Sequence, residues 1–236
     1  LVLHVKKFYL FMMKKLNKSK IIPNEMKREI FFCQNYSHRC LVQFYGFLID
    51  NGQIIGFIYE YMCNGSLNSY VINNHDKINK MFSLMTIYRI SKGIEYLISN
   101  SLIHRDLKPE NILLDNDFIP YISDFETIRQ IDDNEKYTGD IGSTLYSSPE
   151  QDRGDKLSYS TDIYSFGLII YFLFEKNNMR LLNDSNIYLK SENDKILPIT
   201  NCSNNLQHIY VKCINYKPFN RPGIDQIVST IKEEID

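Results

Sequence analysis

The sequence has few of the residues that mark several special classes of protein. Tryptophan is absent, and the five cysteines form neither a C-x-x-C pair nor a zinc-type spacing. An odd number of cysteines without such a framework is typical of a reducing compartment. No apolar run approaches the length of about 18 residues that a membrane-spanning helix needs, and no signal or transit peptide is recognisable. These absences predict a cytoplasmic protein without a membrane span.

Net charge is also nearly absent. Lys and Arg number 27 against 28 Asp and Glu, which gives a charge of −1 at pH 7. Nucleic-acid-binding domains usually carry a basic excess, so no nucleic acid partner is predicted. Apolar residues at 44% and charged residues at 23% are ordinary for a soluble globular protein, and 236 residues suffice for one large or two small domains. The chain begins with Leu1 rather than Met, so we expect it to be a piece of a longer protein.

Two polar stretches, H-R-D-L-K-P-E-N at 104–111 and S-D-F-E at 123–126, carry groups that phosphoryl transfer needs. Asp106 offers a carboxylate that can accept a proton from an attacking hydroxyl. Asn111 and Asp124 offer hard oxygen ligands of the kind that Mg²⁺ prefers. An isolated Arg-Asp pair is often only a surface ion pair, so the interpretation depends on further matches in the same order along the chain.

The first stretch resembles the H-R-D-L-x-x-x-N catalytic loop of protein kinases. The resemblance implies that Asp106 is the catalytic base and that Asn111 and Asp124 bind the metal, with ATP and Mg²⁺ as cofactors. Lys108, two residues after Asp106, would contact the transferred phosphate. A lysine at this place is the form typical of serine/threonine kinases.

The same resemblance implies the fold. It predicts an α+β, bilobal protein-kinase-like structure, with an incomplete N-terminal lobe over 1–61 and a mainly helical C-terminal lobe over 62–236. Within the second part, apolar residues at helical spacing over 81–98 include Met81 and Met85, and we interpret this methionine-rich stripe as core.

Residues 1–11 are rich in β-branched and aromatic side chains and are predicted to form one strand. Within the resemblance, Lys6 near the end of this strand would contact the α- and β-phosphates of ATP and pair with a glutamate. Lys7 is the alternative by one register, and the alternation of strand faces favours Lys6. The helix predicted to follow offers Glu29 as the partner, with Glu25 as the alternative.

Two strand-like runs within 42–61 flank an Asn-Gly pair, which is a strong hairpin signal. By resemblance, the second run leads into the hinge between the lobes, where backbone groups of Glu60 and Met62 would hydrogen-bond the adenine. Tyr59 would occupy the gatekeeper position and narrow the pocket behind the adenine. Leu113 would pack beneath the adenine ring.

Three residues match positions that support the catalytic loop and its surroundings in the same family. Asp162, within T-D-I-Y-S-F-G, would brace the backbone of the catalytic loop. Arg221 would pair with Glu150 of the S-P-E sequence and act as a clamp if the pair is buried.

The polar segment 127–147 corresponds to the kinase activation segment. Arg105 offers a guanidinium that could bind a phosphate added to this segment. Thr138 is the first candidate for that phosphate and Tyr137 is the second.

Two departures from the family pattern stand out. No glycine-rich loop precedes the strand that carries Lys6, so we expect at most three strands and one helix in the N-terminal lobe and an incomplete nucleotide roof. In addition, Glu126 stands where the D-F-G motif has glycine. Glycine permits backbone conformations that other residues reach only at a cost, so Glu126 is expected to restrict Phe125 and to add negative charge near the metal.

The leading hypothesis is a protein serine/threonine kinase that transfers the ATP γ-phosphate to hydroxyl groups of a protein substrate. The alternative is a pseudokinase that acts as a binding or scaffolding module, favoured by Glu126 and by the missing roof. A small-molecule kinase of the aminoglycoside phosphotransferase type is a third hypothesis, against which the S-P-E sequence and Arg221 argue. The sequence leaves the oligomeric state open.

Overall fold

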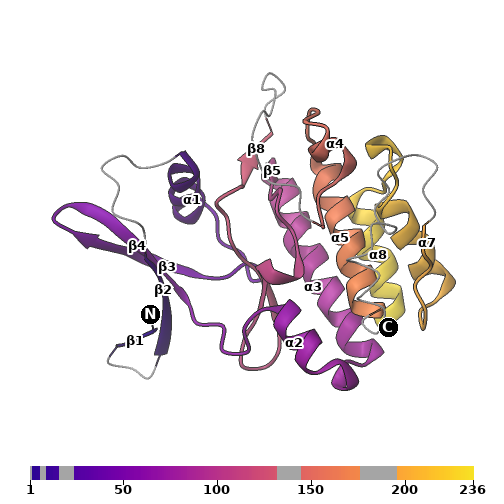
Figure 1. Ribbon diagram of the computed structural model, residues 1–236, viewed down its shortest axis with the longest axis horizontal. Coiled ribbons are helices and arrows are strands. Elements are labelled where there is room, and N and C mark those ends of the chain that lie inside the picture. The colour runs from indigo at the N-terminus through magenta and orange to yellow at the C-terminus, as the bar shows by residue number, and fades with distance from the viewer. Residues whose placement is uncertain (1, 6–8, 16–23, 132–144, 176–195) are drawn as a thin grey trace.

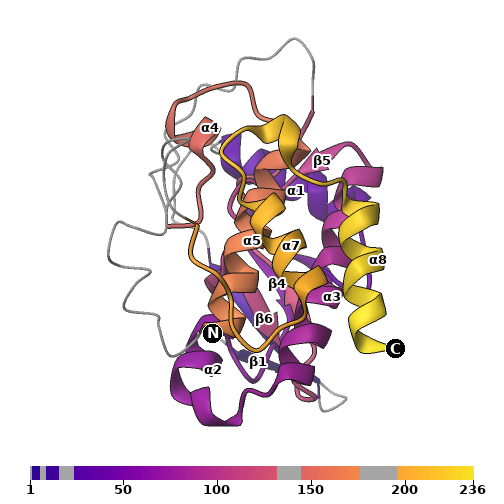
Figure 2. The same ribbon diagram turned by 90° about the vertical axis from the view of Figure 1, so that its right-hand side faces the viewer.

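The computed structural model describes residues 2–5, 9–15, 24–131, 145–175 and 196–236. A four-stranded sheet with one helix beside it occupies one end of the molecule, and most of the helices occupy the other (Figure 1). Seen from the helical end, α5 and α7 lie between α4 and the long helices α3 and α8 (Figure 2). This combination of a separate antiparallel sheet and a helical part is an α+β fold, as the sequence predicts.

The sheet has the strand order β1-β2-β4-β3, and each neighbouring pair is antiparallel. Its strands and the accompanying helix are β1 (Val2–Val5), β2 (Tyr9–Lys15), α1 (Asn24–Asn35), β3 (Phe44–Asp50) and β4 (Gln53–Glu60). The edge strands are β1 and β3. Among the described residues, β1 pairs only with β2, and β3 pairs only with β4.

The first two strands correct the sequence prediction. One strand was predicted over 1–11, but β1 and β2 pair antiparallel, with Val5 opposite Tyr9. The two strands have a similar apolar and aromatic composition, and no Gly, Pro, Asn or Asp stands between them, so the sequence pattern did not reveal the reversal. The sheet consequently has four strands rather than the three expected. Lys6 and Lys7 lie outside the described residues.

The predicted hairpin between the next two strands is confirmed. β3 and β4 pair through Asp50 and Gln53, with Asn51 and Gly52 at the turn. Both turn residues have positive φ, 48° and 75°. Tight two-residue hairpins of the primed type require this backbone at both positions, which is why Asn-Gly is favoured there.

The other part is built from helices and two small two-stranded sheets. Its helices are α2 (Leu67–Asn73), α3 (Lys80–Ser99), α4 (Pro149–Asp152), α5 (Tyr159–Phe174), α7 (Asn204–Cys213) and α8 (Ile224–Ile235). Its paired strands are β5 (Leu102–Ile103) with β8 (Arg129–Gln130), and β6 (Ile112–Leu114) with β7 (Pro120–Ile122).

Helix α5 forms the centre of this part. Every residue from Thr161 to Leu173 is buried, in agreement with the apolar run in the sequence. Gly167 permits α7 to approach closely, since a Cβ atom there would lie 2.6 Å from Ile214 Cγ2 and 2.8 Å from Cys213 Cβ. Within the described ranges, no helix is long and apolar enough to cross a membrane.

Helix α3 shows where the predicted core stripe was placed wrongly. Leu84, Ile94 and Leu97 are buried, but Met81 and Met85 are 51% and 49% exposed. Apolar residues occur on more than one side of this helix, so the 3.6-residue period alone did not fix which side faces the core. The two methionines instead line an open groove beside the β6–β7 hairpin.

A buried ion pair joins α4 to the segment before α8, and the predicted Glu150–Arg221 contact is confirmed. Arg221 Nη1 donates to Glu150 Oε1 at 2.5 Å, and Nη2 donates to Oε2 at 2.8 Å. The side chains are 0% and 3% exposed for Arg221 and Glu150 respectively. Burial alone would raise the pKa of Glu150, but the hydrogen bonds and charge of Arg221 outweigh burial and hold the pKa below its ordinary value.

Replacing Arg221 by alanine should lower the free energy of unfolding by about 3–5 kcal/mol, because it leaves the Glu150 carboxylate buried without its partner. Arg153→Ala is the matched control, since Arg153 pairs with Asp155 in an ion pair whose side chains are 40% and 50% exposed. An exposed pair of this kind contributes about 0–1 kcal/mol. Urea denaturation followed by circular dichroism measures the unfolding free energy of both variants. Equal losses in the two variants would contradict a stabilising role of the buried Glu150–Arg221 pair.

The same pair predicts a pH dependence. The folded-state pKa of Glu150 is lowered, so its contribution to stability is fully present above the ordinary value of 4.5 and is lost as the pH falls through the folded-state pKa. The difference in unfolding free energy between the wild type and Glu150→Gln should therefore shrink on acidification through this range. A constant difference in denaturation experiments across these pH values would disprove it.

Candidate active site

The loop that follows β5 is fixed by a carboxylate from the first turn of α5. Asp162 accepts hydrogen bonds from the backbone N–H groups of His104 (2.7 Å) and Arg105 (2.9 Å), as the sequence predicts. Asp162 is 1% exposed, and burial raises its pKa. Arg105 has a φ of 74°, a left-handed backbone that costs energy in a residue other than glycine and that surrounding contacts must hold.

The His104 ring connects this loop to the segment after β7. His104 Nδ1 accepts from the backbone N–H of Asp106 at 3.3 Å, and Nε2 lies 3.0 Å from the carbonyl oxygen of Ser123. Both contacts are satisfied by a neutral ring with its proton on Nε2. The side chain is buried, so its role is to position the two segments.

Three of the predicted site residues form one cluster around the Asp106 carboxylate. Lys108 Nζ donates to Asp106 Oδ2 at 2.6 Å. Asn111 Nδ2 donates to the same oxygen at 3.0 Å and to the Asp106 carbonyl oxygen at 2.8 Å. The short helix Pro109–Asn111 and the start of β6 place Asn111 there. The Asp106 carboxylate is therefore held in a fixed orientation by two donors.

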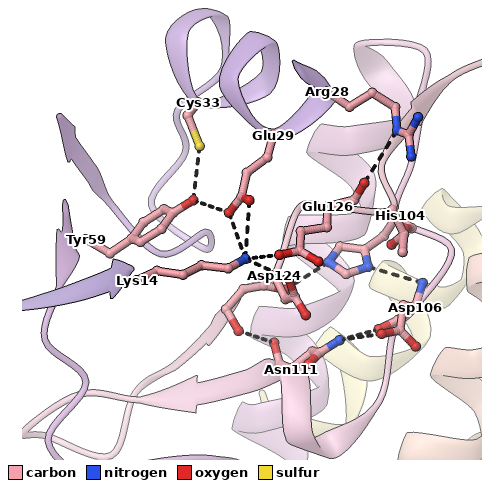
Figure 3. A network of polar contacts seen from close by, with 12 residues as sticks. Lys14, Arg28, Glu29, Cys33, Tyr59, His104, Asp106, Asn111, Asp124 and Glu126 are labelled. Carbon is pink, nitrogen blue, oxygen red and sulfur yellow. Dashed lines mark hydrogen bonds and ion pairs between the residues drawn. The ribbon is translucent and has the colours of Figure 1, made fainter. Parts of the chain in front are cut away.

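The β6–β7 hairpin brings Asp124 to this cluster. Ser123 donates to the Asn111 carbonyl oxygen through both its backbone N–H (2.8 Å) and its Oγ (2.9 Å). Asp124 follows directly, with a φ of 63° and a side chain that is 41% exposed. Phe125, next in the chain, is buried against Phe32 of α1, with ring centroids 4.3 Å apart. Figure 3 shows Asp106, Asn111 and Asp124 around the same space.

The lysine that pairs with Glu29 is Lys14 on β2, so the assignment of that pairing to Lys6 was wrong. Lys14 Nζ lies 3.1 Å and 3.2 Å from the two carboxylate oxygens of Glu29, which confirms Glu29 as the glutamate of the pair. The alternation argument treated only 1–11 as a strand, so it did not extend to Lys14. The run Met12-Met13-Lys14 was the signal available, because it is a second apolar sequence ending in lysine.

Lys14 also contacts two carboxylates from the segment after β7. Asp124 Oδ1 lies 3.5 Å from Lys14 Nζ, and Glu126 Oε1 lies 2.5 Å from it (Figure 3). Burial disfavours the charged ammonium, but the negative charges of Glu29, Asp124 and Glu126 outweigh burial and raise the pKa of Lys14. Lys14 therefore carries its positive charge throughout the physiological range.

Tyr59 on β4 contacts the glutamate of the Lys14–Glu29 pair. Its hydroxyl donates to Glu29 Oε1 at 2.6 Å and lies 3.3 Å from Cys33 Sγ of α1. Glu29 is 1% exposed, and burial raises its pKa, with the charge of Lys14 acting in the opposite direction. Burial raises the pKa of Tyr59 as well, so the hydroxyl keeps the proton that it donates. The sequence placed Tyr59 at the pocket but did not reveal its bond to Glu29.

A cavity of about 230 Å³ lies between the sheet and the β6–β7 hairpin. Its apolar walls come from Met12, Val42 and Leu113, and its polar side includes Lys14 and Asp124. This division suits a nucleotide, whose base is planar and apolar on its faces and whose phosphates are charged.

The two hinge residues lie just outside that cavity. Glu60 ends β4, and its N–H donates to the Gln43 carbonyl oxygen at 2.9 Å. Met62 is buried, and its carbonyl oxygen accepts from Gly65 N–H at 3.1 Å. That backbone groups of Glu60 and Met62 bind an adenine stays a prediction.

A larger groove of about 430 Å³ lies elsewhere, between the outer side of α3 and the β6–β7 hairpin. Its lining includes Met81, Met85 and Phe118 but none of the predicted site residues. Size alone therefore does not identify the active site, whereas the cluster of acids, amide and cation does. Across the ranges that the structure covers, no group of three or more His, Cys, Asp or Glu side chains is arranged to hold a metal by itself.

The model of the protein kinase domain family matches residues 1–231. The chain belongs to the protein kinase family. This match covers nearly the whole chain, and it includes the catalytic loop, the Asp124 segment and the Glu150–Arg221 pair described above. The bilobal α+β prediction is thereby confirmed, and the hypothesis of an aminoglycoside-type small-molecule kinase is set aside.

Curated relatives include both tyrosine and serine/threonine kinases. The kinase domain is 29% identical to human tyrosine-protein kinase TXK, over 93% of this chain and 42% of the relative. It is 28% identical to the probable serine/threonine-protein kinase gdt4 of Dictyostelium discoideum, over 93% of this chain and 14% of the relative. It is 30% identical to a G-type lectin S-receptor-like serine/threonine-protein kinase of Arabidopsis thaliana, over 89% of this chain and 28% of the relative. The chain thus spans less than half the length of each of these relatives.

Predicted activation-segment residues fall partly outside the described ranges. Thr138 and Tyr137 belong to 132–144, which the structure does not describe. Arg105 donates its backbone N–H to Asp162, and its carbonyl oxygen accepts from Gln151 Nε2 at 2.8 Å. Binding of a phosphate by its guanidinium stays a prediction.

Asp162→Asn should loosen the catalytic loop, because an amide offers only one acceptor to the two N–H groups that the carboxylate now satisfies. We expect a loss of about 1–3 kcal/mol in unfolding free energy, the range for leaving a buried donor unpaired. Hydrogen exchange at the amides of His104 and Arg105, read by mass spectrometry of the peptide that contains them, should accelerate. Asp76→Asn, at a side chain 88% exposed, is the control. Unchanged protection in Asp162→Asn would refute the bracing role.

Proposed function

We propose that this domain is a protein serine/threonine kinase that transfers the γ-phosphate of ATP to hydroxyl groups of a protein substrate. The observation that carries the proposal is the arrangement of Asp106, Asn111 and Asp124 beside an intact Lys14–Glu29 pair. A base, two oxygen ligands and a phosphate-binding cation close together are the groups that phosphoryl transfer uses.

Asp106 is the general base of this proposal. Its carboxylate is oriented by Lys108 and Asn111, both on Oδ2, so Oδ1 is the oxygen better placed to accept the proton of the substrate hydroxyl. Lys108 stands beside that oxygen pair and would balance negative charge on the transferred phosphoryl group. General-base assistance of this kind contributes about 10²–10⁴ in rate.

Asn111 and Asp124 are the residues that would hold Mg²⁺. The Asn111 amide nitrogen is committed to Asp106, which leaves its Oδ1 as a metal ligand. Asp124 has an exposed carboxylate next to Lys14. Mg²⁺ in such sites is bound through one or two protein side chains together with substrate phosphates, which agrees with the small number of protein ligands here. When bound, the ion neutralises phosphate charge.

The adenine would lie between the apolar walls made by Met12, Val42 and Leu113. The Glu60 carbonyl could accept from its amino group, and the Met62 N–H could donate to its ring. Lys14 would reach the phosphates while Glu29, held by Tyr59, keeps Lys14 in place. With these roles, the nucleotide would extend from the hinge residues to Asp124.

Specificity for serine and threonine rests on Lys108. The relatives include tyrosine kinases as well as serine/threonine kinases, so their names alone support only a protein kinase. Lys108 contacts Asp106 directly and thereby lies where the hydroxyl of the substrate must arrive. A lysine at this point supports the serine/threonine reading.

One observation favours the pseudokinase alternative. Glu126 Oε1 lies 2.5 Å from Lys14, so the phosphate-binding cation is already engaged by a carboxylate. The φ of Glu126 is not positive, so this residue does not adopt the left-handed backbone that glycine favours. Under this alternative the domain would bind partners without transferring phosphate.

Asp106→Asn should reduce phosphoryl transfer by about 10²–10⁴-fold while leaving the fold intact, because the amide keeps the shape but is no base. The measurement is incorporation of labelled phosphate into the protein itself and into a mixed protein substrate, with Mg²⁺-ATP, followed by phosphoamino acid analysis. Asp117→Asn, an exposed acid outside the cluster, is the control.

The outcomes distinguish a serine/threonine kinase from a tyrosine kinase and from a pseudokinase. Labelled phosphoserine or phosphothreonine in the wild type, lost in Asp106→Asn, supports the serine/threonine kinase. Phosphotyrosine instead would overturn the substrate class. Equal labelling in the wild type and in Asp106→Asn, or none from a folded wild type, would reject the enzyme and favour the pseudokinase.

A further inference from the structure

Lys14 has one fixed carboxylate partner and two exposed ones. Glu29 is fixed, since its side chain is 2% exposed and its Oε1 also accepts from the Tyr59 hydroxyl. Glu126 is exchangeable, since its side chain is 42% exposed and can turn into solvent. Yet Glu126 makes the shortest contact, 2.5 Å from Lys14 Nζ compared with 3.1 Å for Glu29.

The backbone of Glu126 holds this side chain at the pocket. Its carbonyl oxygen accepts from Arg28 Nε of α1 at 3.4 Å (Figure 3). Its neighbour Phe125 is buried against Phe32 of α1. The residue is thus anchored on both sides while its carboxylate reaches back to Lys14. Its place at the polar end of the cavity follows from these anchors, and it is among the residues that line that cavity.

The charges at this end of the cavity do not balance. The carboxylates of Glu29, Asp124 and Glu126 surround Lys14, which is the one cation among the residues lining the cavity in the described part of the chain. A polyphosphate entering alone would have to displace Glu126 from Lys14 and would then face the released carboxylate and Asp124 as like charges. A polyphosphate that arrives with a divalent cation brings the positive charge that offsets both.

We propose that Glu126 makes nucleotide binding depend on a divalent cation, by occupying Lys14 and repelling metal-free nucleotide at the mouth of the phosphate site. Glu126 is then a specificity-determining residue that discriminates between free ATP and its magnesium complex. This inference rests on the proposed function only in that the cavity takes a nucleotide; it does not need phosphate transfer to occur.

Glu126→Gln tests the charge, because the amide has the same shape without the charge. One unit charge within a few ångströms of a phosphate, in a partly exposed site, changes affinity by about tenfold. We expect Glu126→Gln to bind ATP in EDTA about tenfold more tightly than the wild type, and to bind ATP in excess Mg²⁺ within about twofold of it. Isothermal titration calorimetry on the purified protein gives all four dissociation constants without reference to activity.

Three further variants isolate the cause. Glu126→Gly restores the residue of the family pattern and adds backbone freedom, so equal effects of Gly and Gln assign the change to charge. Glu233→Gln removes an exposed charge on α8, far from the cavity, and should leave both dissociation constants unchanged. In a Lys14→Met background, Glu126→Gln should gain less, since the part of the effect that comes from competition for Lys14 is absent.

The outcomes distinguish this inference from the proposed function. If the wild type binds Mg²⁺-ATP and Glu126→Gln leaves the ratio of the two dissociation constants unchanged, or if only the Gly variant changes that ratio, the role of Glu126 is overturned while the nucleotide site stands. If no variant binds ATP under either condition, both this inference and the ATP-dependent function fall. Binding of metal-free ATP by Glu126→Gln but not by the wild type supports both.

Discussion

The buried carboxylate of Asp162 is the interaction on which the geometry of the site depends. It lies in the first turn of the most buried helix and accepts the N–H groups of His104 and Arg105. A carboxylate without water is tolerated only when such donors surround it, so helix and loop require each other. From this fixed point the chain runs directly into Asp106, which explains how an otherwise irregular loop, with one residue in a left-handed conformation, keeps a defined shape.

A second set of contacts ties the sheet to the segment after β7 through side chains from distant parts of the sequence. Lys14 comes from β2, Glu29 from α1, Tyr59 from β4 and Asp124 from the segment after β7. None of these elements could place its polar group alone. The cavity is therefore a product of the relative position of sheet and hairpin, and a change in the position of α1 would separate Glu29 from Lys14.

The sequence was sufficient where the chemistry is contiguous. Asp106, Lys108 and Asn111 lie within one loop, so their types and spacing predicted their cluster, and the Asn-Gly turn predicted the β3–β4 hairpin by its backbone requirement. It was insufficient for the pairing lysine. Two short strands of similar composition looked like one, and the choice among lysines depended on a chain reversal that carries no turn residue of the usual kind.

The sequence also could not show contacts between side chains that come together only when the chain folds. Glu126 was recognised as an unusual residue near the metal, yet nothing in the chain indicated that it would reach Lys14 rather than solvent. The hydroxyl of Tyr59 was likewise invisible as a donor to Glu29. On α3, burial of one stripe over its neighbour was decided by packing against α5 and α8 and not by the pattern itself.

The thiol of Cys33 makes the position of α1 chemically observable. It lies behind Glu29, against the Tyr59 hydroxyl, and burial raises its pKa to about 12. Alkylating reagents attack the thiolate, so this cysteine is inert while α1 stays docked, whereas exposed Cys63 reacts freely. The labelling rate of Cys33 relative to that of Cys63 therefore reports how often α1 separates from the sheet.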